Sequence, residues 1–103
     1  MSERETLEAR LSGAERLRQC ERTASRVIDG KAVVITIDHN QLHVLNAVGT
    51  RVWELADGRP LSDIVDDVVR EFAVDRERAA LDVCTFAEQL LAVGAAEIAG
   101  HRT

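Results

Sequence analysis

Aromatic residues are scarce in this chain of 103 residues, which contains Trp53, Phe72, Phe86 and no tyrosine. The core must therefore be built mainly from Val, Leu, Ile and Ala. A chain of this length buries roughly two-thirds of its unfolded surface, which is enough for one core in one domain. Proline is scarcer still, with Pro60 alone. Because no Pro-, Ser- or Gly-rich tract occurs, we expect no long disordered linker.

Residues that usually bind metals are also few. The two cysteines, Cys20 and Cys84, belong to no CxxC pair, and a structural zinc site needs about four ligands at close spacings. We predict that Cys84 is a core residue, that Cys20 is a free thiol, and that no disulfide joins them. The HxxxH spacing of His39 and His43 would suit zinc on a helix, but a strand would hold the two roughly 13 Å apart. We expect no metal and no cofactor.

Positive charge is in the minority, and long apolar runs are absent. Acids outnumber bases 18 to 13, which gives a formal net charge of -5. This balance disfavours binding to nucleic acid and to an anionic membrane surface. The N-terminal sequence MSERETLEAR is too charged for a signal peptide, and no apolar run approaches the length of about 18 residues that a membrane span needs. A cytoplasmic location is the default expectation.

Residues 1–22 carry many charges of both signs, with apolar side chains at helical spacing at Leu7, Leu11, Ala14 and Leu17. This pattern predicts an N-terminal helical extension over residues 1–22. Its apolar stripe is narrow, so the helix needs a partner surface. That surface belongs to the rest of the domain, to a second copy in a homodimer, or to a partner enzyme.

The next segment has the pattern of a three-stranded antiparallel meander. Residues 26–28 form a short extended run, and Asp29-Gly30 is a strong signal for a two-residue hairpin. Residues 31–37 read KAVVITI and are the clearest strand of the chain. A polar turn at residues 38–41 then leads to a third strand over residues 42–45.

Helical periodicity takes over at Asn46, a good N-cap. The first helix ends at Asp57-Gly58, since glycine commonly follows a helix C-terminus, and residues 59–61 connect it to a second helix capped by Ser62. A third helix runs from its cap at Asp75 to Gly94. Residues 95–98 form a last short strand, and residues 100–103 form a tail. Strands grouped before helices indicate an α+β fold, here a domain over residues 23–99.

No set of residues has catalytic spacing, so we expect a protein that is not an enzyme. The carboxylates of the second helix lie opposite its apolar stripe and are typical of a solvated face, at Asp63, Asp66, Asp67 and Glu71. Three helices and a small sheet also suit a winged helix-turn-helix regulator that binds DNA. A helix that reads a DNA groove should be basic, however, and the second and third helices are net acidic.

The ordered set of motifs resembles the PqqD family, that of the pyrroloquinoline quinone biosynthesis protein D, whose members are also called peptide chaperones or RiPP recognition elements. The resemblance covers residues 26–98. It rests on Leu45-Asn46, Trp53, Asp57-Gly58, Asp63-Ile64-Val65, Asp82-Val83, Phe86, Leu90 and Gly94. It implies a winged-helix-like fold and a protein that binds the leader of a ribosomally made precursor peptide. Such a protein presents the leader to a modifying enzyme, either a radical SAM protein or a leader peptidase.

The resemblance also implies a site. In this family the leader adds as a strand to the third strand of the sheet, which corresponds here to Leu42, His43, Val44 and Leu45. An unpaired strand edge gives affinity with little demand on the sequence of the peptide. The side chains of Leu42 and Val44 share one face of this strand, and those of His43 and Leu45 share the other.

The third helix would supply the wall of the peptide groove, with Asp82, Phe86 and Gln89 as candidates. Each has an alternative role. Phe86 and Trp53 also suit the core, and Asp82 suits the electrostatics of the start of a helix.

Three features depart from the family pattern. Asp38-His39 stand where members that make pyrroloquinoline quinone usually have Pro-Glu, which favours another peptide system. Residues 1–22 exceed the family core. The CxxxCxxC motif of radical SAM enzymes is absent, so any such chemistry must lie in another protein.

Two other hypotheses remain: an acidic winged-helix scaffold or regulatory domain that binds a protein partner, and a DNA-binding regulator.

Overall fold

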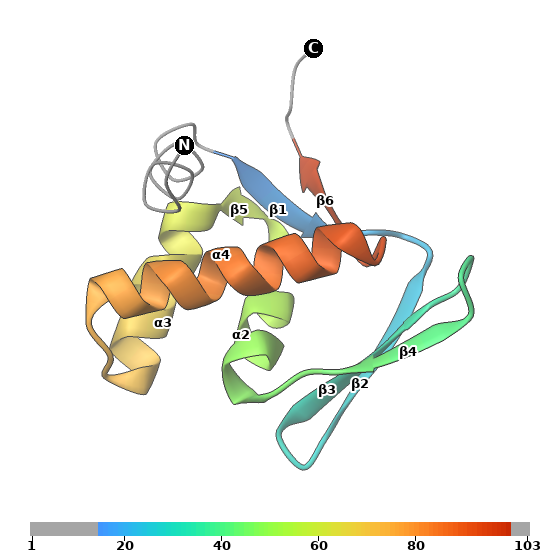
Figure 1. The fold of residues 1–103 in the computed structure, drawn as a ribbon, viewed down its shortest axis with the longest axis horizontal. Coiled ribbons are helices and arrows are strands. Elements are labelled where there is room, and N and C mark those ends of the chain that lie inside the picture. Colours follow the sequence, from blue (N-terminus) through green and yellow to red (C-terminus); the bar gives the residue numbers. More distant parts are fainter. Residues whose placement is uncertain (1–14, 100–103) are drawn as a thin grey trace.

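The computed structural model describes residues 15–99, which form six strands and three helices (Figure 1). In chain order these elements are β1 (Arg16–Gln19), β2 (Thr23–Ile28), β3 (Lys31–Thr36), β4 (Gln41–Val44), α2 (Ala47–Leu55), β5 (Asp57–Pro60), α3 (Leu61–Phe72), α4 (Arg76–Ala92) and β6 (Ala96–Ala99).

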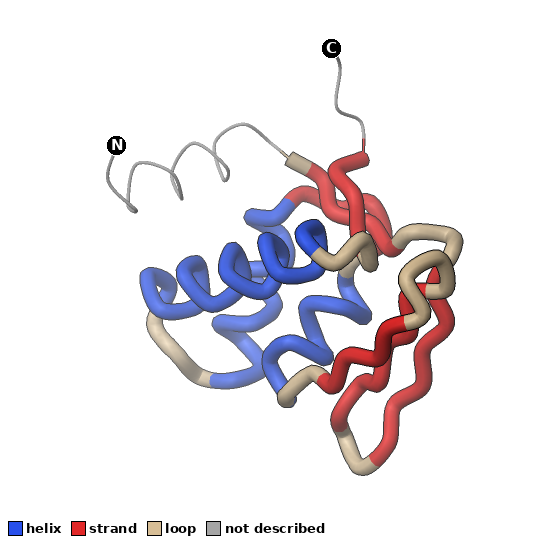
Figure 2. Tube along the Cα trace, turned by 45° about the vertical axis from the view of Figure 1, so that its right-hand side comes forward, coloured by secondary structure: helices blue, strands red, loops and turns tan. Residues whose placement is uncertain are grey.

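The strands form two antiparallel sheets of three strands each, with the orders β2-β3-β4 and β5-β1-β6. Figure 2 shows the first sheet standing beside the helices, and the second lying at the end of the helical layer. The order of a meander followed by helices confirms the predicted α+β, winged-helix-like fold.

The β2–β3 hairpin turns at Asp29 and Gly30, as predicted. Both residues have positive φ angles, of 53° and 77°, which is the backbone geometry that suits the twist of a two-residue hairpin. The register pairs Ile28 with Lys31 directly across the turn. The first strand of the meander is longer than expected, because its pairing with β3 extends back to Thr23.

Two of the three predicted helix caps are confirmed. The Asn46 side chain accepts a hydrogen bond from the Gly49 N–H at 2.8 Å, and that of Asp75 accepts one from the Arg78 N–H at 2.8 Å. The cap predicted at Ser62 is wrong, because α3 begins at Leu61 with Pro60 as its N-cap. The φ angle that proline imposes suits the start of a helix, and the Leu61 N–H donates to the Glu15 carbonyl at 2.9 Å.

The helical extension predicted over residues 1–22 is wrong for Arg16–Gln19, which form strand β1; residues 1–14 lie outside the described part of the chain. Leu17 is fully buried in the core. Because β1 lies between β5 and β6 and pairs with both, its main-chain groups bond to segments far away in the sequence. Such tertiary pairing overrides a local helical spacing.

The end predicted for the first helix is also wrong. Helix α2 stops at Leu55 with Ala56 as its C-cap, and the predicted cap and connection form strand β5. Pairing with β1 explains the extended backbone: Arg59 lies opposite Leu17, and Pro60 opposite Arg16. Gly58 has a φ of 101°, which a residue with a side chain rarely adopts.

The core is aliphatic, as the shortage of aromatic residues predicts. Its largest fully buried side chains include Leu17, Val34, Val52, Leu61, Ile64, Val65, Val68 and Val83. Trp53 is 3% exposed and lies within this cluster, which confirms its role as a core residue. Cys84 is buried as predicted, Cys20 is partly buried, and no disulfide joins them. No helix within residues 15–99 has the length and apolar character needed to cross a membrane.

Candidate functional site

Strand β4 is an outer strand of its sheet, and its side chains alternate between two environments. Leu42 and Val44 are 60% and 62% exposed. His43 is half-buried, and Leu45, directly after the strand, is buried in the core. The two pairs therefore lie on opposite faces, as predicted.

The main chain of β4 alternates in the same way. The Leu45 N–H donates to the Ala32 carbonyl at 2.8 Å, so this residue turns its amide toward β3. In an antiparallel ladder, every second residue directs its N–H and C=O groups to the other side. Val44 and Leu42 therefore direct theirs away from β3. Within residues 15–99, no strand pairs with that edge of β4.

A groove of about 430 Å³ runs between this edge and the C-terminal half of α4. It is lined by Leu42, His43, Val44, Leu45, Gln89, Leu90 and Val93. Five of the seven predicted site residues are thus brought together, four from β4 and its end and one from α4. The lining is mainly apolar, which suits the side chains of a peptide laid along the strand.

Sequence reasoning missed Leu90 and Val93. Their spacing is the signal that could have found them: Val93 lies one helical turn after Gln89, and residues three or four apart share a helix face. Leu90 is 2% exposed and forms the floor of the groove as part of the core.

Asp82 and Phe86 are not among the residues that line the groove. They lie on the same side of α4 as Gln89 and Val93, because positions 82, 86, 89 and 93 are separated by three or four residues. The Phe86 ring packs against Gly49 at the start of α2, and Asp82 accepts a hydrogen bond from Arg78 at 3.3 Å. Their role in peptide binding stays a prediction.

Two hydrogen bonds of Thr50 brace the end of the groove where β4 leads into α2. Its buried hydroxyl accepts from the Ala32 N–H at 2.7 Å and donates to the Leu45 carbonyl at 3.3 Å. These bonds tie α2 to β3 and to the residue after β4. Deeper in the groove, the Nε2 atom of His43 is buried and has no hydrogen-bond partner.

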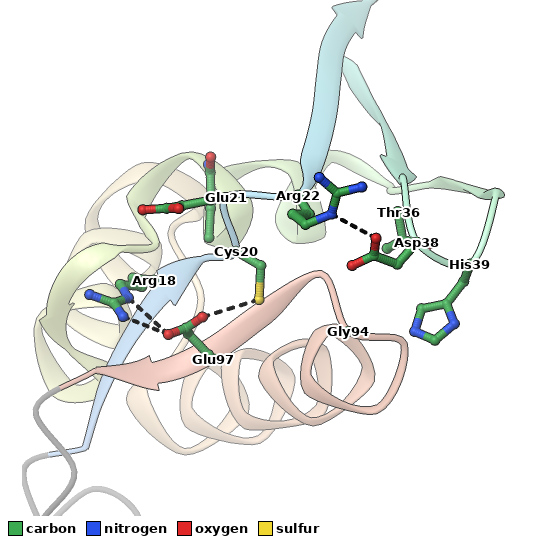
Figure 3. Close-up of a pocket in the computed structure, with 10 residues that line it drawn as sticks. Arg18, Cys20, Glu21, Arg22, Thr36, Asp38, His39, Gly94 and Glu97 are labelled. Atoms are coloured by element: carbon green, nitrogen blue, oxygen red, sulfur yellow. Dashed lines mark hydrogen bonds and ion pairs between the residues drawn. The ribbon is translucent and has the colours of Figure 1, made fainter.

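A second cavity, of about 630 Å³, is polar and lies between the two sheets (Figure 3). Arg18 donates to Glu97 at 2.6 Å within one sheet, and Arg22 donates to Asp38 at 2.6 Å, joining the β1–β2 connection to the β3–β4 turn. The Cys20 thiol donates to the second oxygen of Glu97 at 3.5 Å. The cavity therefore lies at a junction between the two sheets where ion pairs line its walls, and it is separate from the apolar groove.

These contacts shift two titrating groups in opposite directions. The hydrogen bond from Arg18 holds the pKa of the Glu97 carboxyl below its ordinary value. Partial burial, reinforced by the bond to Glu97, raises the pKa of the Cys20 thiol. The Cys20 side chain is thus kept in the neutral thiol form at pH 7.

The acidic face predicted on α3 consists largely of ion pairs at the surface. Asp66 pairs with Arg76, Asp67 with Arg59 and Arg70, and Glu71 with Arg51. Within residues 15–99, no cluster of three or more His, Cys, Asp or Glu side chains could hold a metal ion.

Comparison with known proteins shows the family. The model of the family described as coenzyme PQQ synthesis protein D (PqqD) matches residues 31–95. Two solved structures share the fold. TbiB1 in complex with the TbiA(beta) leader peptide has 26% identity, 84% coverage of this chain, 99% of that chain and a TM-score of 0.71. A lasso peptide synthetase B1 complexed with the leader peptide has 21% identity, coverages of 79% and 96%, and a TM-score of 0.68.

No curated protein matches the chain. PqqD-like RiPP recognition elements are known as non-catalytic binding proteins. Because the family match spans well over half of the sequence, the chain belongs to the PqqD family.

Proposed function

We propose that this protein binds the leader of a ribosomally synthesised precursor peptide and presents it to a modifying enzyme, without catalysing a reaction itself. The observation that carries the proposal is the edge of β4, which no strand of residues 15–99 pairs with, beside an apolar groove. The leader-bound state of the two similar solved structures supports it. So does the family, since PqqD proteins bind the precursor peptides of radical SAM enzymes.

The chemistry of the edge suits a leader strand. The main-chain groups of Leu42 and Val44 would bond to a peptide laid beside them, as in other cases where a strand is added to a sheet. Main-chain bonds give affinity without reading the sequence. Specificity would come from alternate peptide side chains, which enter the groove between Leu45, Leu90 and Val93. We therefore expect apolar leader residues at groove-facing positions, with Gln89 available to a polar neighbour.

The modifying enzyme is a separate protein, either a radical SAM enzyme or a leader peptidase. The chain is similar to leader-bound lasso peptide synthetase B1 proteins. In lasso-peptide pathways of this family the modifying enzyme is a leader peptidase, so this similarity supports a leader peptidase as the partner. Asp38-His39, in place of the Pro-Glu usual in members that make pyrroloquinoline quinone, supports a pathway other than that one. The proposal places the protein in the cytoplasm, where ribosomal precursors are made.

The direct test is a titration with the leader of a precursor encoded beside this protein's gene. A fluorescein-labelled synthetic leader should show saturable binding by anisotropy, with a scrambled leader and the core peptide alone as controls. Calorimetry with unlabelled peptide checks the affinity. Absence of binding to any neighbouring leader at concentrations on the order of tens of micromolar would refute the proposal.

A further inference from the structure

The outer face of the β2–β3–β4 sheet is apolar and turned away from the helices, and no element within residues 15–99 covers it. The register places Ile35 between Ala24 and Leu42, and Val33 between Arg26 and Val44. Neighbours across antiparallel strands share a face. On this face Ile28, Ile35, Leu42 and Val44 are 52%, 38%, 60% and 62% exposed. An apolar patch of this kind on a small protein marks an interaction site.

The face has a hollow over β2 and β3, of about 350 Å³, lined by Ala24, Ser25, Arg26, Ile28, Val33 and Ile35. Its size and lining suit several aliphatic side chains from another molecule.

Charge on this face has one sign. Of the outward positions on the three strands, Arg26 and Lys31 are the charged ones, and none holds a carboxylate. The chain as a whole has a net charge of -5. A surface that fits the face is therefore apolar at its centre and carries acidic side chains opposite Arg26 and Lys31.

We propose that this outer face docks the modifying enzyme, through apolar side chains that fill the hollow and carboxylates that pair with Arg26 and Lys31. The inference rests on the proposed function. Strand β4 links the two surfaces, because the side chains of Leu42 and Val44 lie on the outer face while their main-chain groups lie at the leader edge. An enzyme docked there lies directly beside the bound leader.

The charges disfavour a second copy of the chain as the occupant. In a two-fold pair of outer faces the same patch meets itself, so Arg26 and Lys31 of both copies would lie in one interface with no carboxylate on either face to pair with them. The acidic net charge likewise disfavours an anionic membrane.

The test combines Arg26→Glu with Ile35→Thr, which reverses one charge and removes apolar surface while keeping a β-branched residue in the strand. The matched control is Arg70→Glu on α3, where the arginine side chain is 72% exposed. Two quantities are measured for each protein: the affinity for the labelled leader, and the affinity of the protein–leader complex for the enzyme encoded beside the precursor gene. Processing of the precursor is followed in the same series.

The double variant should bind the leader within about twofold of the unchanged protein, while its complex binds the enzyme at least about tenfold more weakly and processing slows accordingly. The control should match the unchanged protein in both affinities. Normal enzyme binding by the double variant overturns the docking proposal alone. A dimer that the double variant converts to monomers overturns it in favour of self-association. No leader binding by the unchanged protein refutes the proposed function, and the docking proposal with it.

Discussion

Phe86 lies so close to Gly49 that a Cβ atom on the glycine would be 2.8 Å from Cε1 of the ring. The ring therefore packs on the bare backbone of the first turn of α2, which follows directly from β4. This contact fixes the spacing between α4 and the end of β4, the two walls of the groove. Helix propensity alone would disfavour glycine at position 49. The close approach of the Phe86 ring explains why a residue without a Cβ atom stands there.

Gly49→Ala should lower the free energy of unfolding by about 1–3 kcal/mol, because the added methyl group overlaps the ring. This net loss already includes the gain of up to about 1 kcal/mol that alanine, compared with glycine, brings to a helix. Urea denaturation measures the change. In a Phe86→Leu background the same substitution should cost much less, and an equal cost in both backgrounds would show that the ring is not responsible.

Val44→Pro should weaken leader binding by about fivefold and leave the fold intact. The N–H that proline removes points to the free edge of β4, so the bonds to β3 survive, and one main-chain bond contributes about 1 kcal/mol. The matched variant is His43→Pro, whose N–H faces β3, and it should destabilise the sheet itself. Anisotropy and circular dichroism separate the two effects. Unchanged leader affinity in a folded Val44→Pro protein would exclude strand addition here.

His43→Leu should raise the free energy of unfolding by about 1 kcal/mol. The buried Nε2 atom of His43 has no hydrogen-bond partner, so replacing the ring by an apolar side chain removes a desolvated polar atom. Chemical denaturation gives the change. A clear loss of stability would mean that the imidazole makes a bond, for example to a buried water.

Leu17→Ala should lower the free energy of unfolding by about 2–5 kcal/mol, because Leu17 is fully buried and its removal leaves a cavity. The same substitution at Leu42, which is 60% exposed, should change it by no more than about 0.5 kcal/mol. Thermal and urea unfolding of the two variants provide the comparison. Similar costs at both positions would contradict the assignment of β1 to the core.

The Arg18–Glu97 pair should make stability depend on pH in the acid range. Folding lowers the pKa of Glu97 below its ordinary value of 4.5, so the contribution of the carboxylate is fully present above that value. It is lost as the pH falls through the lower pKa of the folded state. Urea midpoints between pH 7 and pH 3 should therefore converge for the unchanged protein and Glu97→Gln. Arg18→Gln should remove the same dependence, and parallel curves would argue against the pair.

Elements with strong local signals could be predicted from the sequence. Asp29-Gly30 specifies a hairpin through the backbone angles it tolerates, and Asn46 and Asp75 carry the side-chain oxygen that a helix start needs. The strand expected to bind the leader came from the resemblance to the PqqD family. Its alternation predicted which side chains share a face, and the burial of Leu45 beside the exposed Val44 agrees with that prediction.

Strands β1 and β5 could not be predicted, because their four residues carry no period of their own. Leu17 matches a helical spacing and a strand equally well, and Gly58 suits a helix end as well as an extended turn. What decides both is the pairing of Arg16 with Pro60 and of Leu17 with Arg59, contacts between segments more than 40 positions apart. The predicted lining of the groove was incomplete for a related reason. In the sequence, Leu90 and Val93 have the pattern of core residues, and only the position of β4 beside α4 shows that they line the groove.

At Leu42 and Val44 of strand β4, the main-chain groups and the side chains lie on different surfaces of the protein. The N–H and C=O groups at its edge are the same for every amino acid except proline, whereas the side chains on the outer face differ with each substitution. In the proposed arrangement, natural variation at these two positions would follow a changing enzyme surface without altering the hydrogen bonds offered to the leader. A system built this way can exchange its enzyme by altering a few outward side chains and keep its peptide.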